Sequence, residues 1–231
     1  PIANVAKYEL TLPSQQKTIS FRPFLVKEEK ILLIALESGK PDEMLTAVKE
    51  IVKACTFGTI EPDEYPIFDI EYIFLNIRAK SVGEVAKLKV LCPDDKKSYG
   101  NVDVDLTKVE VYVDDTHNNN IVLDESRKLG VVLKYPSLKV IDSGILGDNI
   151  KVSAMYDLIK KSVDHIYEGD KTYYAKDSTP QELTDFVDNL TGDQMRKIQN
   201  FFSSMPRLEH KIKVTNPNTK VESEVTLKGL T

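Results

Sequence analysis

The spacing of hydrophobic residues changes in blocks along this chain, and this feature constrains its fold most strongly. Residues 7–12 and 17–21 place an apolar side chain at every second position, which is typical of a hairpin with one face in water. From about residue 27 to residue 80 the spacing lengthens to three and four, which predicts helices. Beyond Gly83 the spacing shortens to two again. Because strands and helices come in blocks and do not strictly alternate, the sequence predicts an α+β fold.

Clear end signals frame the first helices. We expect helices at residues 27–39, 41–55 and about 64–80. Gly39 suits the end of the first helix, because glycine readily takes the left-handed conformation that closes a helix. Pro41 suits the first turn of the second helix, where no backbone N–H is needed.

The rest of the chain combines short strands with further helices. Helical spacing returns from Asp148 to Tyr167, and Thr179 and Thr191 are placed to cap two more helices. A final hairpin is predicted from Leu208 to Leu227. Short strands are predicted at residues 85–91, 101–106, 108–113, 121–123 and 130–133.

These elements divide the chain into three predicted regions. The N-terminal hairpin and its helices occupy residues 1–82. A β-rich region occupies residues 83–135 and is completed by residues 206–231. Residues 136–205 between them form a helical insert in the C-terminal part of the chain.

Two of the predicted hairpins resemble each other. Residues 87–96 and 211–220 share Lys, Val and Pro at equal offsets, like the paired knuckles of a zinc ribbon. A structural zinc site needs four thiolates or imidazoles, and Cys92 is the one soft ligand here. The other three knuckle positions hold Asp95, Asn216 and Thr219. We therefore predict a degenerate, zinc-ribbon-like pair of hairpins that lie side by side without metal, and chance similarity or an old duplication is the alternative.

Composition excludes several classes of protein. The chain has 231 residues, 41% hydrophobic and 29% charged, which is enough to bury a core without disulfides or metal. Its net charge of −5 argues against binding to nucleic acid, which requires clustered Lys and Arg. No apolar stretch is long enough to predict a membrane span. Two cysteines cannot form a disulfide framework, and a reducing cytosol fits best.

Catalytic signatures are mostly missing from the sequence. It contains no nucleophile elbow, phosphate loop or dinucleotide-binding glycine motif. Asp103 and Asp105 share one strand face, but a solvated face explains them better than acid–base chemistry. Cys55 lies on an apolar helical stripe, where an inert buried thiol is usual. The histidines lack metal-ligand spacing: His117, His165 and His210. We expect no cofactor and no enzyme, although an unrecognised site remains an alternative.

Several long segments resemble a known family. Residues 8–14 (YELTLPS) and 22–33 (RPFLVKEEKILL) resemble the opening of a tail baseplate protein family of T-even-like contractile-tail bacteriophages. Residues 68–84 (FDIEYIFLNIRAKSVGE) resemble its central block, and residues 190–206 and 214–230 resemble its end. The family includes the baseplate hub subunit and the baseplate hub assembly protein. Some members carry more cysteines in the two hairpin turns, and this chain departs from them there.

The resemblance implies a non-enzymatic part in building the baseplate hub. The implied partners are other tail and baseplate hub proteins, including helical segments of the tape measure protein, with no nucleic acid and no membrane. The chain would act in the host cytoplasm during assembly and then in the tail baseplate of the virion. The alternative is a chaperone-like assembly factor that holds hub or tape measure protein and is absent from the mature virion.

Partner contacts are expected in two of the resembling blocks. Arg78 and Lys80 could pair with acids of a partner, and a partner helix could lie in an apolar groove. The remaining contact candidates are Arg22, Phe24, Lys27, Glu28 and Tyr72. The alternative is that the apolar residues of these blocks simply form the core: Phe24, Ile31, Leu33, Ile34, Ile70, Phe74 and Ile77.

Overall fold

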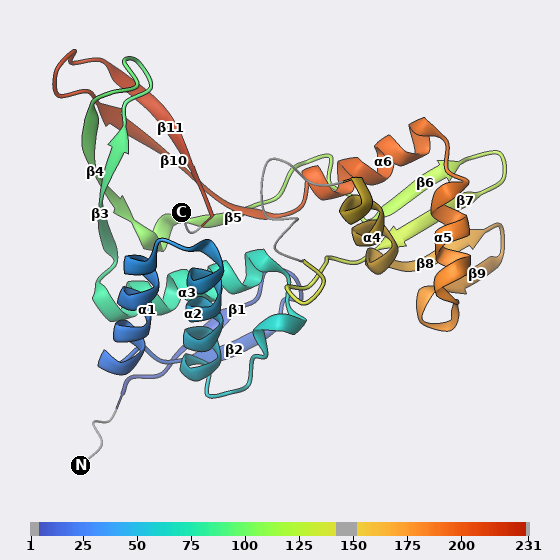
Figure 1. Ribbon diagram of the computed structural model, residues 1–231, viewed down its shortest axis with the longest axis horizontal. Coiled ribbons are helices and arrows are strands. Elements are labelled where there is room, and N and C mark those ends of the chain that lie inside the picture. Colours follow the sequence, from blue (N-terminus) through green and yellow to red (C-terminus); the bar gives the residue numbers. More distant parts are fainter. Residues whose placement is uncertain (1–4, 142–151, 230–231) are drawn as a thin grey trace. The chain divides into compact units, whose positions relative to one another are not determined.

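The computed structural model describes residues 5–141 and 152–229, and Figure 1 shows the order of its elements. The mixture of helices and small antiparallel sheets confirms the predicted α+β class. The chain forms two compact units. The first unit contains residues 1–62, 67–112 and 207–231, and the second contains residues 63–66 and 113–206.

The described part of the first unit contains a hairpin, three helices, two longer hairpins and one further short strand, β5. In chain order these are β1 (Tyr8–Thr11), β2 (Thr18–Phe21), α1 (Val26–Ser38), α2 (Pro41–Cys55), α3 (Ile67–Val82), β3 (Val85–Leu91), β4 (Tyr99–Asp105), β5 (Glu110–Tyr112), β10 (Arg207–Thr215) and β11 (Glu222–Lys228). Short 3₁₀ turns occur at Pro62–Glu64, Leu106–Lys108 and, in the second unit, Ala175–Asp177.

The predicted helix ends are confirmed where the sequence carries cap signals. Gly39 follows α1 with φ 63°, and its N–H bonds to the carbonyl of Leu36. Pro41 occupies the first turn of α2, as expected. α3 buries residues around much of its circumference, as a central helix must: Phe68, Asp69, Ile70, Ile73, Phe74, Ile77 and Ala79. The buried carboxylate of Asp69 ties this helix to the β1–β2 turn by accepting the N–H of Ser14 at 3.0 Å.

The two longer hairpins of the first unit lie against each other. β3 pairs with β4, and β10 pairs with both β11 and β5, all antiparallel. Gly100 on β4 permits the close approach of β10. A methyl group at Gly100 would collide with the Val214 side chain and lie 2.9 Å from the carbonyl oxygen of Thr215. The absence of a side chain at this position therefore allows the two ribbons to pack.

The second unit places three helices against a four-stranded antiparallel sheet. The sheet order is β6-β7-β8-β9. Side chains from sheet and helices share one core, which includes Val131, Ile159 and Phe201. Its elements are β6 (Asn120–Asp124), β7 (Leu129–Leu133), α4 (Val152–Ser162), β8 (Val163–Glu168), β9 (Lys171–Tyr174), α5 (Pro180–Asp188) and α6 (Gly192–Ser203).

One predicted helix is wrong at its C-terminal end. The expected helix from Asp148 to Tyr167 begins outside the described residues and ends at Ser162, and β8 follows directly. β8 is paired on both edges, with β7 and β9, so tertiary pairing overrides the helical spacing. The missed signal is the loop Gly169–Asp170, since Gly169 takes φ 58° in a tight turn of the kind that joins hairpin strands. The region expected to be helical thus contains a β-hairpin.

Candidate docking surface

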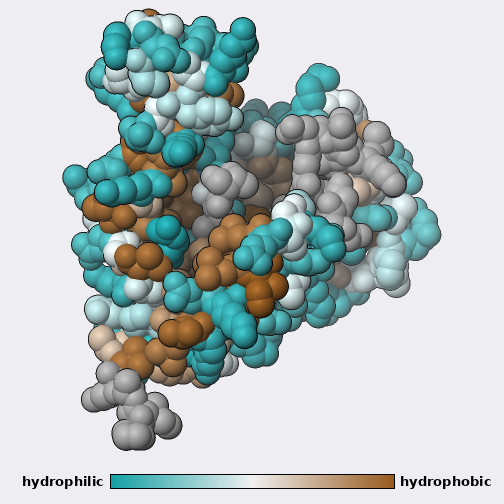
Figure 2. Space-filling view, turned by 60° about the vertical axis from the view of Figure 1, so that its left-hand side comes forward, coloured by the Kyte–Doolittle hydropathy of each residue, from teal (hydrophilic) through white to brown (hydrophobic). Residues whose placement is uncertain are grey.

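Helix α1 exposes an unusual amount of hydrophobic surface. Its residues buried against the rest of the unit are Glu28 and Ala35. Three apolar side chains in its C-terminal half are 52%, 56% and 55% exposed, and we call them the α1 ridge: Leu33, Ile34 and Leu36. Figure 2 shows hydrophobic residues gathered on the part of the molecule below the hydrophilic hairpin tips. A helix that is apolar around its circumference is normally covered, so the ridge is a candidate interface.

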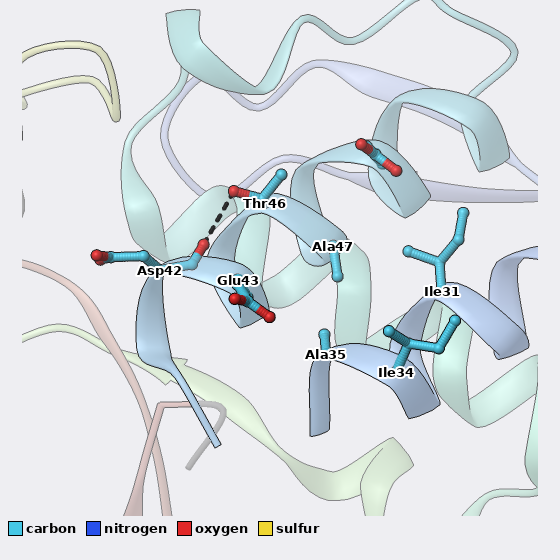
Figure 3. A pocket seen from close by; sticks show the side chains of 8 residues that line it. Ile31, Ile34, Ala35, Asp42, Glu43, Thr46 and Ala47 are labelled. Carbon is cyan, nitrogen blue, oxygen red and sulfur yellow. Dashed lines mark hydrogen bonds between the residues drawn. The ribbon is translucent and has the colours of Figure 1, made fainter. Parts of the chain in front are cut away.

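An open hollow lies beside this ridge, between α1 and α2. Figure 3 shows Ile31, Ile34 and Ala35 of α1 and Ala47 of α2 around it. Its volume is about 320 Å³. Polar groups of α2 border it: Asp42, Glu43, Thr46 and Glu50. The hollow therefore continues the hydrophobic surface of the ridge towards α2, where acidic side chains border it.

The base of α1 is held by an internal ion pair. Arg22 Nη2 lies 3.0 Å from Glu28 Oε1, and Nη1 lies 3.4 Å from Oε2. Glu28 is 2% exposed and also accepts the backbone N–H of Leu25 at 2.7 Å. Burial opposes ionisation of Glu28, but the hydrogen bonds from Arg22 and Leu25 outweigh it and lower the pKa of this carboxyl group. The pair joins the end of β2 to the first turn of α1.

The predicted contact residues in this block mostly face inwards. Phe24 is buried, and its N–H donates to Ser81 Oγ at 2.9 Å. Lys27 is exposed beside the ion pair, with Nζ 3.5 Å from Glu28 Oε1. The structure therefore buries Phe24 and Glu28, leaves Arg22 partly exposed beside Glu28, and places Lys27 at the surface.

The predicted contact residues on α3 are spread over different sides of the helix. Tyr72 is half-buried, and its carbonyl accepts the side-chain amide of Asn76. Lys80 is exposed and bonds to Glu84 at 2.8 Å, which raises the pKa of the lysine. Arg78 is half-buried and lines a cavity of the first unit. The structure therefore does not bring the seven candidates together on one surface.

The turns of the two long hairpins, which contain the four knuckle positions, lie side by side. Asn216 Nδ2 donates to both carboxylate oxygens of Asp94, at 3.0 and 3.1 Å, and Thr219 Oγ1 donates to Asp94 Oδ2 at 2.6 Å. Asp95 instead accepts hydrogen bonds within its own turn, from Ser98 and Lys97. Cys92 is buried close by in the first turn. Hydrogen bonds to Asp94 therefore join the two turns. The comparison of the two hairpin sequences does not single out this residue. The likeness to a zinc ribbon stays a prediction.

One histidine and one serine of the second unit lie within hydrogen-bonding distance of each other. His117 Nδ1 lies 2.9 Å from Ser204 Oγ, and its other ring nitrogen lies 3.0 Å from the hydroxyl of Tyr135. Ser204 is 3% exposed and donates to the carbonyl of Asn200 at 2.6 Å. Burial lowers the pKa of His117 and raises the pKa of the Cys55 thiol to about 11. The half-buried imidazole of His117 and the buried thiol of Cys55 are therefore mainly neutral near pH 7.

Neither a cluster of metal ligands nor a membrane-spanning helix occurs in the described ranges. Over residues 5–141 and 152–229, no three His, Cys, Asp or Glu side chains gather closely enough to hold a metal ion. Within the same ranges, every helix is too short or too polar to span a bilayer. What remains as a candidate site is the hydrophobic surface of α1 and its surroundings.

Comparison with known proteins gives one informative result. The chain matches the family described as T4 bacteriophage base plate protein over residues 5–231. No individual curated protein matches it significantly, and no solved structure does either.

Proposed function

Because the chain belongs to the T4 bacteriophage base plate protein family, we propose that it is a structural part of the baseplate hub that binds other tail proteins. The family match covers nearly the whole chain, so it applies to both units. A protein of this kind needs complementary surface more than reactive groups, which agrees with the burial of Ser204 and Cys55.

The α1 ridge is the observation that supports docking most directly. Leu33, Ile34 and Leu36 each expose more than half of their surface, and they belong to the continuous apolar stretch of α1 at residues 31–36. Full burial of one such side chain contributes about 1.5–3 kcal/mol, so completing the burial of three half-exposed ones contributes on the order of a few kcal/mol. A neighbouring tail protein that covers the ridge would gain this stabilisation.

A phage carrying Leu33→Gln and Leu36→Gln tests the proposal. We expect the variant chain to fold but to be depleted from purified baseplates and virions, measured by quantitative mass spectrometry against the other tail proteins. Leu91→Gln is the matched control, because Leu91 is 43% exposed on β3 and lies outside the ridge. Normal incorporation of the double variant would refute docking through the ridge.

The same measurement on the wild-type phage tests the hub role. A hub component is present in mature virions at a fixed ratio to other baseplate proteins. If the wild-type chain occurs in assembly intermediates and is absent from virions, the structural role is wrong and a transient assembly factor replaces it. If the chain occurs neither in assembly intermediates nor in virions, both the structural role and the assembly-factor role are wrong.

A further inference from the structure

A larger cavity lies within the first unit, and it is lined by other residues of α1 and α2 than the hollow in Figure 3. Its volume is about 590 Å³, which is within the range of pockets that hold ligands. Helices and hairpins both contribute to its apolar wall: Leu36, Val48, Phe74, Leu88, Leu208 and Leu227. Few polar atoms line it, so water inside it would find few hydrogen-bond partners.

Arg78 is the charged group of this cavity that lacks a partner among the described residues. Glu209 also lines the cavity, but it pairs with Arg207 at 3.0 Å. Arg78 makes no ion pair and no hydrogen bond with the parts of the chain that the structure describes, although it is half-buried. A guanidinium stays charged at all physiological pH values, and burying it without an anion is unfavourable.

The cavity is also continuous with the α1 ridge. Leu36 is part of the ridge, where it is 55% exposed, and it also lines the cavity. Leu32 on the same helix lines the cavity as well. A segment that covers the ridge can therefore place a side chain in the cavity without leaving the surface of α1. This continuity favours a protein segment over a free small molecule.

We propose that the cavity receives an aliphatic side chain of another tail protein, and that an Asp or Glu next to it pairs with Arg78. The apolar wall selects the aliphatic group, and the unpaired guanidinium selects the carboxylate, which it can bind with two parallel hydrogen bonds. Side chains three or four positions apart on a helix lie on one face, so one helical turn can supply both groups. This inference rests on the proposed function, because it names the chemistry of the partner at that surface.

Cross-linking at the cavity mouth identifies the occupant. A photo-crosslinking amino acid replaces Leu36 in the phage-encoded chain, and cross-linked peptides are sequenced from assembly intermediates. We expect a peptide of another tail protein with an aliphatic residue and an Asp or Glu within four positions. Cross-links confined to a second copy of this chain, to its own residues 230–231, which follow Gly229 at the cavity wall, or to a lipid would overturn the proposal.

Charge reversal at Arg78 tests the pairing itself. For Arg78→Glu we expect about a tenfold or larger fall in the chain recovered with baseplate intermediates, because truncating one partner of a desolvated ion pair weakens binding at least that much. Arg78→Lys should retain part of the recovery. Lys17→Glu is the control, since Lys17 is an exposed cation of the same unit outside the cavity. Changing the partner's cross-linked acid to Lys should restore recovery of Arg78→Glu.

The outcomes separate this inference from the proposed function. Circular dichroism first establishes that Arg78→Glu is folded, and Arg78→Gln replaces it if it is not. If the wild-type chain is recovered with baseplate intermediates and the Arg78 variants are recovered equally well, the pairing is wrong and the proposed function stands. If the wild-type chain is not recovered with them at all, the proposed function itself fails.

Discussion

Replacing Glu71 by Gln should stabilise the first unit above neutral pH. Glu71 lies on α3, and burial raises the pKa of its carboxyl group from 4.5 to about 7. The folded state thus holds the proton more tightly than the unfolded chain does. The free energy of unfolding is then highest below about pH 4.5, falls as the pH rises to about 7, and levels off above that.

The two pKa values set the size of the effect. They differ by about 2.5, and each pKa unit corresponds to about 1.4 kcal/mol, so the upper limit is about 3.5 kcal/mol. The Glu71 side chain is half-buried, so water still reaches it and reduces this value. We expect Glu71→Gln to raise the free energy of unfolding by about 1–2 kcal/mol at pH values near 8.

Urea denaturation at a series of pH values measures this directly. The wild-type chain should lose stability between about pH 5 and pH 7.5, and Glu71→Gln should lose less. Glu37→Gln provides the control, because Glu37 is exposed on α1 and its charge is solvated. An unchanged pH dependence in Glu71→Gln would refute the assignment of the burial penalty to this carboxyl group.

Two further predictions concern contacts that hold elements of the first unit together. Glu28→Ala leaves the partly buried guanidinium of Arg22 without its anion and should lower the free energy of unfolding by about 2–3 kcal/mol, measured by urea denaturation; a loss below about 1 kcal/mol would show that the pair is not needed. Gly100→Ala forces a methyl group against β10 and should cost about 1–3 kcal/mol in the same assay. Gly192→Ala is its control, because a methyl group at Gly192 meets no atom closer than 3.9 Å, and equal effects of both variants would refute the packing argument.

Local signals explain why much of the fold could be predicted. Gly39 and Pro41 define helix ends through the conformation of one residue, and Thr179 and Thr191 do so through hydrogen bonds to residues three positions on. Each signal acts within a single turn, so no knowledge of the rest of the molecule is needed. β8 was mispredicted because its two pairing partners, β7 and β9, are brought to it by the tertiary fold.

The candidate site could be predicted only in part, for a related reason. The sequence predicts partner contacts in the block that contains α1. It does not predict which apolar side chains of this block are exposed, because burial depends on what packs against each residue. Phe24, Ile70, Phe74 and Ile77 are buried in the core, whereas Leu33 and Ile34 are exposed, although all six are apolar residues in similar surroundings. Likewise, Glu28 looks like a surface charge in the sequence and is enclosed with Arg22 in the structure.

Two kinds of information therefore contribute to the description of this protein. Residue order alone carries the helix caps, the turns, the similarity of the two hairpins and the membership of a baseplate family, because these depend on neighbours along the chain. Three features emerge only from packing: the open ridge of α1, the joining of the hairpin turns by Asp94, and Arg78 in an apolar cavity without an anion among the described residues. Packing sets burial and pairing through contacts between residues that are far apart in the sequence.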